Sequence, residues 1–247
     1  MKQNISILKL DWDTEFFGFK IGKVETDLNE EFDLENLVAA AKAMSFKLIY
    51  LSAASPLELE TATNISLADS KYHIQLVDKK TTYEKLVSQS IMKNEAIFSY
   101  TDKLPNEALN QLAIASGVYS RFKIDNRIKN DKYEQLYRLW MTNSVNRKFA
   151  KEVFVYQFEN EFAGMITLTE KDNMASIGLV AVNGLHRKKG IGKALVQAAE
   201  YWAYKNSYSK IQVLSQAANV PSNHLYTSLG YSLKSVDWFY HLWLDDV

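Results

Sequence analysis

The stretch that decides the fold of this chain is Val180–Leu195, which reads VAVNGLHRKKGIGKAL. An apolar run typical of a buried strand leads into a loop with the pattern R-x-x-G-x-G, and an amphipathic helix follows from Gly190. Glycines in such a loop let the backbone approach a ligand closely, and the free N–H groups of a helix N-terminus attract negative charge. The stretch therefore predicts a binding site for a diphosphate.

Two other diphosphate-binding motifs do not fit this stretch. The dinucleotide fingerprint G-x-G-x-x-G needs a third glycine where Leu195 stands, and it opens a fold at its first strand rather than near its end. The phosphate loop of nucleotide triphosphatases needs a hydroxyl side chain after Lys193, where Ala194 stands. The remaining alternative is an ordinary strand–helix turn with a solvated basic face.

The composition excludes several classes of function. The 247 residues include 29 Lys and Arg and 29 Asp and Glu, so the net charge is zero and no global field attracts nucleic acid or an anionic membrane. The absence of cysteine excludes disulfides, thiolate metal sites and a cysteine nucleophile. The four histidines lack the spacing of ligand pairs, so we expect no metal site. The N-terminus does not read as a signal peptide, and no apolar run approaches the roughly 20 residues of a membrane helix, so we expect a cytoplasmic protein.

Hydrophobic periods of 2 and 3.6 residues alternate along the chain, which predicts an α/β fold. Strands are expected near 18–25, 47–51, 72–86, 96–100, 152–158, 162–169, 175–182, 210–214 and 238–244. Helices are expected over 33–44, 57–67, 106–117, 132–146, 190–205 and 219–229. Gly117 and Gly230 are expected just past the ends of two of these helices, where a left-handed residue is common.

One segment of the chain echoes another. KLIYLSAA at 47–54 aligns with KIQVLSQA at 210–217, and a proline-containing helix start and an aromatic strand start follow each copy. An internal duplication and a chance likeness of two strand–helix–strand segments both explain this echo.

Two motifs together resemble the GNAT acyltransferase superfamily. Val180-x-Val182 followed by Arg187-x-x-Gly190-x-Gly192 is similar to its acetyl-CoA-binding motif. Asn219 and the run LYTSLGY at 225–231 are similar to the N-x₆-Y and L-Y-x-x-x-G-[FY] patterns that follow its fifth strand. Gly184 departs from the proline of many members, which affects the stiffness of the loop. LDWDTEFFG at 10–18, SRF at 120–122 with Asp125, and the 136–144 segment resemble, more loosely, the bacterial dTDP-fucosamine N-acetyltransferases.

The resemblance implies a domain organisation and an activity. It implies a mixed, mostly antiparallel sheet flanked by helices over 95–247, after a smaller α/β domain, 1–94, which the internal echo allows to be a degenerate GNAT half. It implies direct acetyl transfer from acetyl-CoA, without a metal, to the amino group of a nucleotide-linked amino sugar. A peptide N-terminus, another small amine, or non-catalytic acetyl-CoA binding are the alternatives. The expected partners are a small-molecule acceptor and a second copy of the chain in a homodimer.

The resemblance also implies roles for residues on the acetyl-CoA side. Backbone groups of Val180 and Val182 would align the pantetheine arm and polarise the thioester carbonyl. Tyr226 would protonate the departing thiolate, the alternative being a packed aromatic residue. Asn219 would bond a CoA amide or cap its helix. The pyrophosphate would be held by Arg187, Lys188, Lys189, Gly190, Ile191, Gly192 and Lys193.

On the acceptor side, the roles are less sharply defined. Arg121 lies between two helices that usually roof the acceptor site, so it would bind the acceptor's diphosphate, or else pair with Asp125. Phe17 would wall the acceptor pocket together with Phe16, or else pack in a core. No acidic side chain lies within 176–182, so the amine would lose its proton to water or arrive neutral. His241 and Glu170 are weaker candidates for a base, with structural roles as the alternative.

Overall fold

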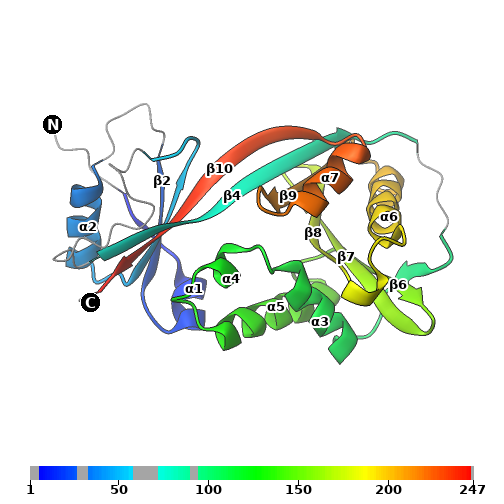
Figure 1. Cartoon of the computed structure of the whole chain (residues 1–247), viewed down its shortest axis with the longest axis horizontal. Helices are drawn as coiled ribbons and strands as arrows, with labels where there is room; N and C mark the ends of the chain where they lie inside the picture. The colour runs from blue at the N-terminus through cyan, green and yellow to red at the C-terminus, as the bar shows by residue number, and fades with distance from the viewer. Residues whose placement is uncertain (1–5, 27–32, 58–71, 90–93, 246–247) are drawn as a thin grey trace. The chain divides into compact units, whose positions relative to one another are not determined.

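A computed structural model describes residues 6–26, 33–57, 72–89 and 94–245 (Figure 1). The chain divides into two compact units. Unit 1 comprises Met1–Lys80 and Val236–Val247, and unit 2 comprises Thr81–Ser235. The sequence predicted domains of 1–94 and 95–247, so the division found here lies earlier in the chain and returns the C-terminal end to unit 1. The strands β4 (Tyr72–Leu86) and β10 (Ser232–Leu244) each contribute residues to both units.

Unit 1 has an α/β core. Its elements are β1 (Leu8–Lys9), α1 (Asp11–Phe17), β2 (Ile21–Thr26), α2 (Leu34–Ala43) and β3 (Leu48–Ala53), with parts of β4 and β10. β1 pairs with β2 antiparallel, β2 pairs with β3 parallel, and β10 pairs with β3 antiparallel. Buried apolar residues of α2, β3 and β10 form one cluster. The helix expected over 57–67 lies almost wholly outside the described residues.

The helix α1 was not predicted, and its ends show why it forms. Asp11 and Asp13 lie in its first turn, where carboxylates stabilise the helix through the partial positive charge of its N-terminus. Gly18 ends the helix with φ +81° and donates its N–H to the Thr14 carbonyl oxygen. Seven residues are too short to display a clear period of 3.6, so the sequence pattern predicted no element over 11–17.

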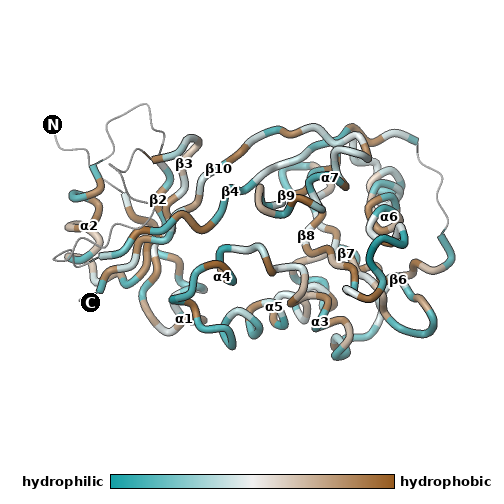
Figure 2. The backbone as a smooth tube through the Cα atoms, viewed as in Figure 1, coloured by the Kyte–Doolittle hydropathy of each residue, from teal (hydrophilic) through white to brown (hydrophobic). Residues whose placement is uncertain are grey.

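Unit 2 contains a mixed sheet, as predicted. Its strands are β4, β5 (Ile97–Ser99), β6 (Glu152–Phe158), β7 (Glu161–Lys171), β8 (Met174–Val182) and β9 (Lys210–Gln216). Their order is β4-β9-β8-β7-β6-β5; β5 to β8 pair antiparallel, and β8 pairs with β9 parallel. Glu159 and Asn160 turn between β6 and β7 with φ of 50° and 66°, as a two-residue hairpin loop of type I′ requires. In Figure 2, much of the backbone of β7 and β8 has the colour of hydrophobic residues.

Helices cover both faces of the sheet in unit 2 (Figure 1). They are α3 (Glu107–Ser116), α4 (Arg121–Ile124), α5 (Asn130–Val145), α6 (Ile191–Lys205) and α7 (Val220–Ser228). Met165 packs with residues of α3 and α5, whereas its neighbour Ile166 packs with residues of α6 and α7. Because successive side chains of a strand point to opposite faces, the two helix pairs lie on opposite sides of β7.

The two copies of the internal echo form equivalent strands. Residues 48–53 form β3 and residues 210–216 form β9. Each lies parallel to the strand before it, with α2 between β2 and β3 and α6 between β8 and β9. The matching connections support an internal duplication, which stays a prediction.

The two predicted helix-ending glycines end their helices with different backbone conformations. Gly230 has φ +83° and follows α7, as predicted. Gly117 ends α3, also as predicted, but its φ of −98° lies outside the left-handed region. A Cβ at Gly117 would lie 2.1 Å from the ring of Tyr137 in α5. The position therefore needs glycine because α3 ends directly against an aromatic ring.

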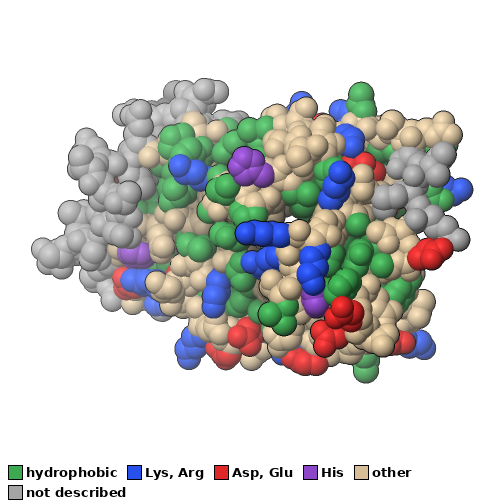
Figure 3. All heavy atoms as spheres, turned by 45° about the vertical axis from the view of Figure 1, so that its right-hand side comes forward, with side chains coloured by type: hydrophobic (Ala, Val, Ile, Leu, Met, Phe, Trp, Pro, Cys, Tyr) green, Lys and Arg blue, Asp and Glu red, His purple; other side chains and the backbone are tan. Residues whose placement is uncertain are grey.

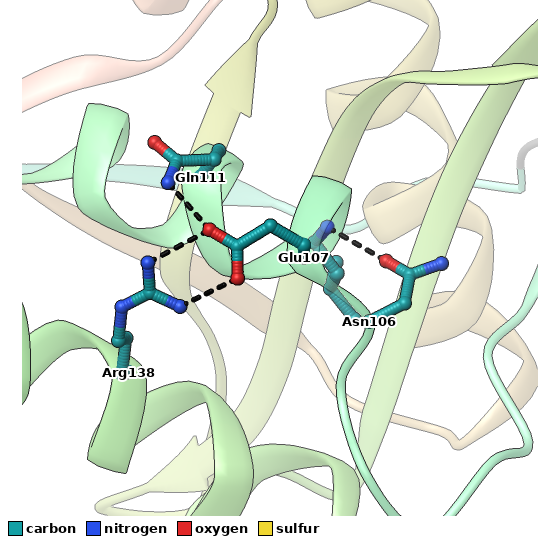
Figure 4. A network of polar contacts seen from close by, with 5 residues as sticks. Asn106, Glu107, Gln111 and Arg138 are labelled. Carbon is teal, nitrogen blue, oxygen red and sulfur yellow. Dashed lines mark hydrogen bonds and ion pairs between the residues drawn. The ribbon is translucent and has the colours of Figure 1, made fainter.

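An exposed ion pair joins α3 to α5 (Figure 4). Nη1 and Nη2 of Arg138 each donate to the Glu107 carboxylate at 2.8 Å, and Nε2 of Gln111 donates to the same carboxylate at 2.6 Å. Arg138 and then Gln111 lower the pKa of Glu107 from its ordinary value of 4.5 to about 2. The side chain of Asn106 caps α3 by accepting the Leu109 N–H at 2.9 Å.

Among the described residues, every helix is too short or too polar to cross a membrane.

Candidate active site

The sheet of unit 2 opens between β8 and β9. Within the described residues, pairing between these strands is confined to Ala175–Ile177 and Ile211–Val213, although β8 continues to Val182 and β9 to Gln216. The C-terminal half of β8 therefore keeps β7 as its partner and separates from β9. The predicted acetyl-CoA-binding residues begin at this opening.

A bulge in β8 marks the start of the opening. Ile166 of β7 lies opposite Val180, whereas Leu168 lies opposite Ile177, so β8 contains one extra residue at this point. The hydroxyl oxygen of Thr167 accepts the N–H of Leu179 at 2.8 Å. A Cβ on Gly178 would lie 2.7 Å from that same oxygen. Thr167 and Gly178 thus shape the bulge. Neither residue was predicted from the sequence, because their roles depend on how β7 and β8 pair.

The backbone groups of Val180 and Val182 point into the opening. The Asn183 N–H donates to the Ala163 carbonyl on β7 at 2.8 Å. Hydrogen-bonded positions alternate along an antiparallel ladder, so Val182, opposite Gly164, and Val180, opposite Ile166, occupy non-hydrogen-bonded positions. Their N–H and C=O groups therefore face away from β7, toward the side that β9 has left. This is the arrangement that the predicted roles of Val180 and Val182 need.

The loop after β8 delivers the N-terminus of α6 next to this opening. Gly190 precedes α6 with φ +80°, and no side chain in the described part of the chain caps the helix. The first N–H groups of a helix have no intrahelical acceptor, and the first turn here, Ile191 to Ala194, contains no acidic residue. A Cβ at Gly190 would meet nothing within 4 Å, so the glycine is needed for its left-handed backbone.

The cations of the loop point in different directions. Arg187, Lys188, Lys189 and Lys193 are all exposed, and Lys and Arg side chains gather on the face shown in Figure 3. The Arg187 Nε donates to the Val182 carbonyl oxygen at 3.4 Å, on the side of the opening. The Lys189 Nζ instead lies 4.4 Å from the centre of the Phe158 ring on β6 and 3.5 Å from His186 Nδ1.

Tyr226 is buried in the core of unit 2. Its side chain is 1% exposed, and its ring lies 5.9 Å from that of Tyr83 and 5.8 Å from that of Tyr231. Burial raises the pKa of the Tyr226 phenol above its ordinary value of 10.0. A raised pKa keeps the proton that an acid must donate, but it also makes the tyrosinate that donation leaves more costly. The geometry is compatible with both the acid and the packing interpretation.

Asn219 caps α7, as one of its two predicted roles requires. Its Oδ1 accepts the Ser222 N–H at 3.3 Å, and Pro221 stands in the first turn of the helix. A contact of the Asn219 side chain with a CoA amide stays a prediction.

The predicted acceptor residues belong to different units. Arg121 begins α4 in unit 2, where it is partly exposed and its guanidinium carbon lies 4.7 Å from the centre of the Phe122 ring. Asp125 is 1% exposed and accepts the Arg127 N–H at 2.9 Å, which closes the turn after α4. Phe17 lies in unit 1, buried at 9% exposure. Its ring lies 5.0 Å from Phe16 and 6.1 Å from Phe19, an arrangement that fits core packing.

The two weaker candidates for a base make contacts that are typical of structural residues. His241 is fully buried in β10 and stacks on Tyr50 in unit 1, with the ring centres 4.9 Å apart. Glu170 pairs with Lys151 and accepts the Tyr208 hydroxyl at 2.9 Å. The hydrogen bond from Lys151, followed by that from Tyr208, lowers the pKa of Glu170, which weakens it as a base. Among the described residues, no three His, Cys, Asp or Glu side chains gather as a metal site would need.

The comparisons with known proteins agree with this geometry. A profile of the acetyltransferase (GNAT) family matches residues 117–231, all within unit 2. A streptothricin acetyltransferase of Escherichia coli is 34% identical over 82 residues, which are 33% of this chain and 47% of that protein. The chain thus spans about half the length of that relative. A dTDP-fucosamine acetyltransferase of Escherichia coli is 24% identical over 243 residues, 97% of this chain and 100% of that protein.

Solved structures share the fold. A conserved protein of unknown function from Staphylococcus epidermidis aligns with a TM-score of 0.58 at 13% identity, over 99% of this chain and 92% of that one. A GCN5-related N-acetyltransferase from Sphaerobacter thermophilus aligns with a TM-score of 0.53 at 14% identity, over 96% and 75%. These structures show the shared fold, and the profile match shows that residues 117–231 form an acetyltransferase domain of the GNAT family.

Proposed function

We propose that the chain transfers an acetyl group from acetyl-CoA to the amine of a nucleotide-linked amino sugar. The observation that carries the proposal is the opening between β8 and β9, which presents the backbone of Val180 and Val182 directly before a loop of cations and an uncapped helix N-terminus. The first part suits a thioester and an amide-containing arm, and the second suits a pyrophosphate.

The chain's own residues divide the work as follows. The N–H groups of α6 and the Arg187 side chain hold the pyrophosphate, and the backbone at Val180 and Val182 aligns the arm and donates to the carbonyl being attacked. Tyr226 holds a proton for the leaving thiolate. A thiol of pKa about 8.5 lies at least 1.5 units below a phenol of pKa 10, so the transfer is uphill by at least about 2 kcal/mol. Contacts formed on binding must supply this energy.

The choice of acceptor is supported by the pattern of relatives. The dTDP-fucosamine acetyltransferase aligns along nearly the whole chain, whereas the streptothricin acetyltransferase aligns along a third of it. Residues outside the GNAT match thus align with the dTDP-fucosamine acetyltransferase and not with the streptothricin acetyltransferase. The higher identity of the streptothricin enzyme, 34%, favours another small amine as the second candidate.

A thiol-release assay separates these candidates. Purified protein with acetyl-CoA is offered a nucleotide-linked 4-amino sugar, streptothricin, or a peptide with a free N-terminus, and free CoA is titrated. The proposal expects turnover with the sugar at the highest kcat/KM. Turnover with streptothricin or peptide alone would reject the sugar, and acetyl-CoA binding without turnover on any amine would favour a binding module.

The matched variants test the loop. Gly190→Val should weaken acetyl-CoA binding, because the helix start needs a left-handed residue, whereas Gly190→Asn should retain more affinity because Asn tolerates that conformation. Unchanged calorimetric affinity in Gly190→Val would show that the loop does not hold the cofactor.

A further inference from the structure

The loop before α6 sends two cations to opposite sides of the helix N-terminus. On one side, a Cβ at Gly192 would lie 3.3 Å from Leu225 of α7 and 3.7 Å from Val182, and Arg187 contacts the Val182 carbonyl there. On the other side, Ile191 lies against Gly164 of β7. Lys189 extends toward the hairpin formed by β6 and β7, where its Nζ lies over the ring of Phe158 at the end of β6.

The position of the Lys189 ammonium is set by an aromatic face and an imidazole. Its Nζ lies 4.4 Å from the centre of the Phe158 ring, within the range of a cation–π contact. The same Nζ lies 3.5 Å from Nδ1 of His186, which is buried and packs on Phe158 at 5.1 Å between ring centres. For Nδ1 to accept from an ammonium, His186 must carry its proton on Nε2, which lies 3.8 Å from Glu161 Oε2.

This ammonium lies far from the opening in the sheet. Phe158 is on β6, and the strand order places β7 between β6 and β8, while the opening is on the far edge of β8. At about 4.8 Å per strand, β6 is about 10 Å from β8. An anion that lies at the α6 N-terminus on the side of Gly192 therefore has Arg187 beside it and Lys189 beyond it.

We infer that Lys189 binds the 3′-phosphate on the ribose of coenzyme A, separately from the pyrophosphate. The inference rests on the proposed function, because it needs acetyl-CoA at the loop. Coenzyme A carries two phosphate groups in its pyrophosphate and a third on the adenosine ribose, so two separated anions require two separated cations. Arg187 and the helix N-terminus serve the first, and Lys189, braced by Phe158 and His186, serves the second.

Calorimetry with acetyl-CoA and 3′-dephospho-acetyl-CoA tests the inference, because the two ligands differ only in that phosphate. The wild-type chain should prefer acetyl-CoA by roughly tenfold, as one charge-assisted contact provides. Lys189→Ala should bind both ligands with the affinity that wild type shows for the dephospho ligand. Lys205→Ala removes the lysine at the C-terminal end of α6, 14 residues and about 21 Å from Ile191 at its start, and should keep the wild-type preference.

Phe158 separates positioning from general electrostatics. Phe158→Leu removes the aromatic face without changing any charge, and it should reduce the preference, whereas Phe158→Tyr should restore it. An equal affinity of wild type for both ligands would overturn the inference. So would a preference that survives in Lys189→Ala, or an equal loss for both ligands in that variant, which would place Lys189 on the pyrophosphate. Failure of wild type to bind either ligand would instead reject the proposed function.

Discussion

The bulge in β8 makes a quantitative prediction about Gly178 and Thr167. A Cβ at Gly178 would lie 2.7 Å from the Thr167 hydroxyl oxygen, while its next contacts, at 3.7 and 3.9 Å, are ordinary. Gly178→Ala should therefore destabilise unit 2 by about 1–3 kcal/mol through overpacking. Thr167→Ala removes the acceptor of the Leu179 N–H and should also cost about 1–3 kcal/mol.

The two costs should not add. Once Thr167 is alanine, the oxygen that obstructs the new methyl group is gone, so Gly178→Ala should cost little in that background. The double variant should then be more stable than the sum of the single variants by about 1–3 kcal/mol, a coupling within the range known for residues in contact. Thr167→Ser keeps the oxygen and is the matched control, with stability near that of wild type.

Urea denaturation of the wild type and the variants measures this coupling, and calorimetry with acetyl-CoA measures its effect on the site. Thr167→Ala should also weaken acetyl-CoA binding, because the bulge aims the backbone of Val180 and Val182 into the opening. Additivity within about 0.5 kcal/mol would refute the contact between Gly178 and Thr167. A normal affinity in a folded Thr167→Ala protein would refute the link between the bulge and the site.

Three further predictions concern single side chains. If the phenol is the acid, Tyr226→Phe should lower kcat by about 10²–10⁴-fold at unchanged acetyl-CoA affinity. A wild-type rate of acetyl transfer in a single-turnover assay would instead show that Tyr226 only packs in the core. Arg121→Ala should raise the KM for a nucleotide-linked sugar by about ten- to a hundredfold and leave the KM for acetyl-CoA unchanged. If Arg121→Ala and Asp125→Ala instead lose stability equally, without a selective change in KM, Arg121 serves only to pair with Asp125. The pKa of Glu107 is lowered to about 2, so the stability it contributes is complete above its unfolded pKa near 4.5 and is lost as the pH falls toward 2. Acid titration of the unfolding free energy should show a shallower fall in Arg138→Gln, and identical curves would show that the ion pair contributes nothing.

The sequence by itself determined most of the local elements and predicted the nature of the main ligand site. Periodicity located β6, β8, α5 and α6 to within one or two residues, since each is long enough to display its period. The glycine spacing and the cations at 187–193 predicted an anion site, because consecutive residues form the N-terminus of a helix and the loop before it. The order of Asn219 and Tyr226 after a strand completed the resemblance to the GNAT superfamily.

Tertiary structure decided everything that depends on pairing between distant residues. The separation of β8 from β9 follows from a one-residue change of register against β7, which no pattern within β8 displays. The same is true of the burial of Tyr226 beside Tyr83, and of Gly117, which is required by a ring 20 residues away rather than by its own dihedral angle. Lys189 read as one of several equivalent lysines, yet its direction is set by Phe158 on another strand. A local sequence states which groups are present, whereas the direction in which each one points depends on neighbours that only the folded chain brings together.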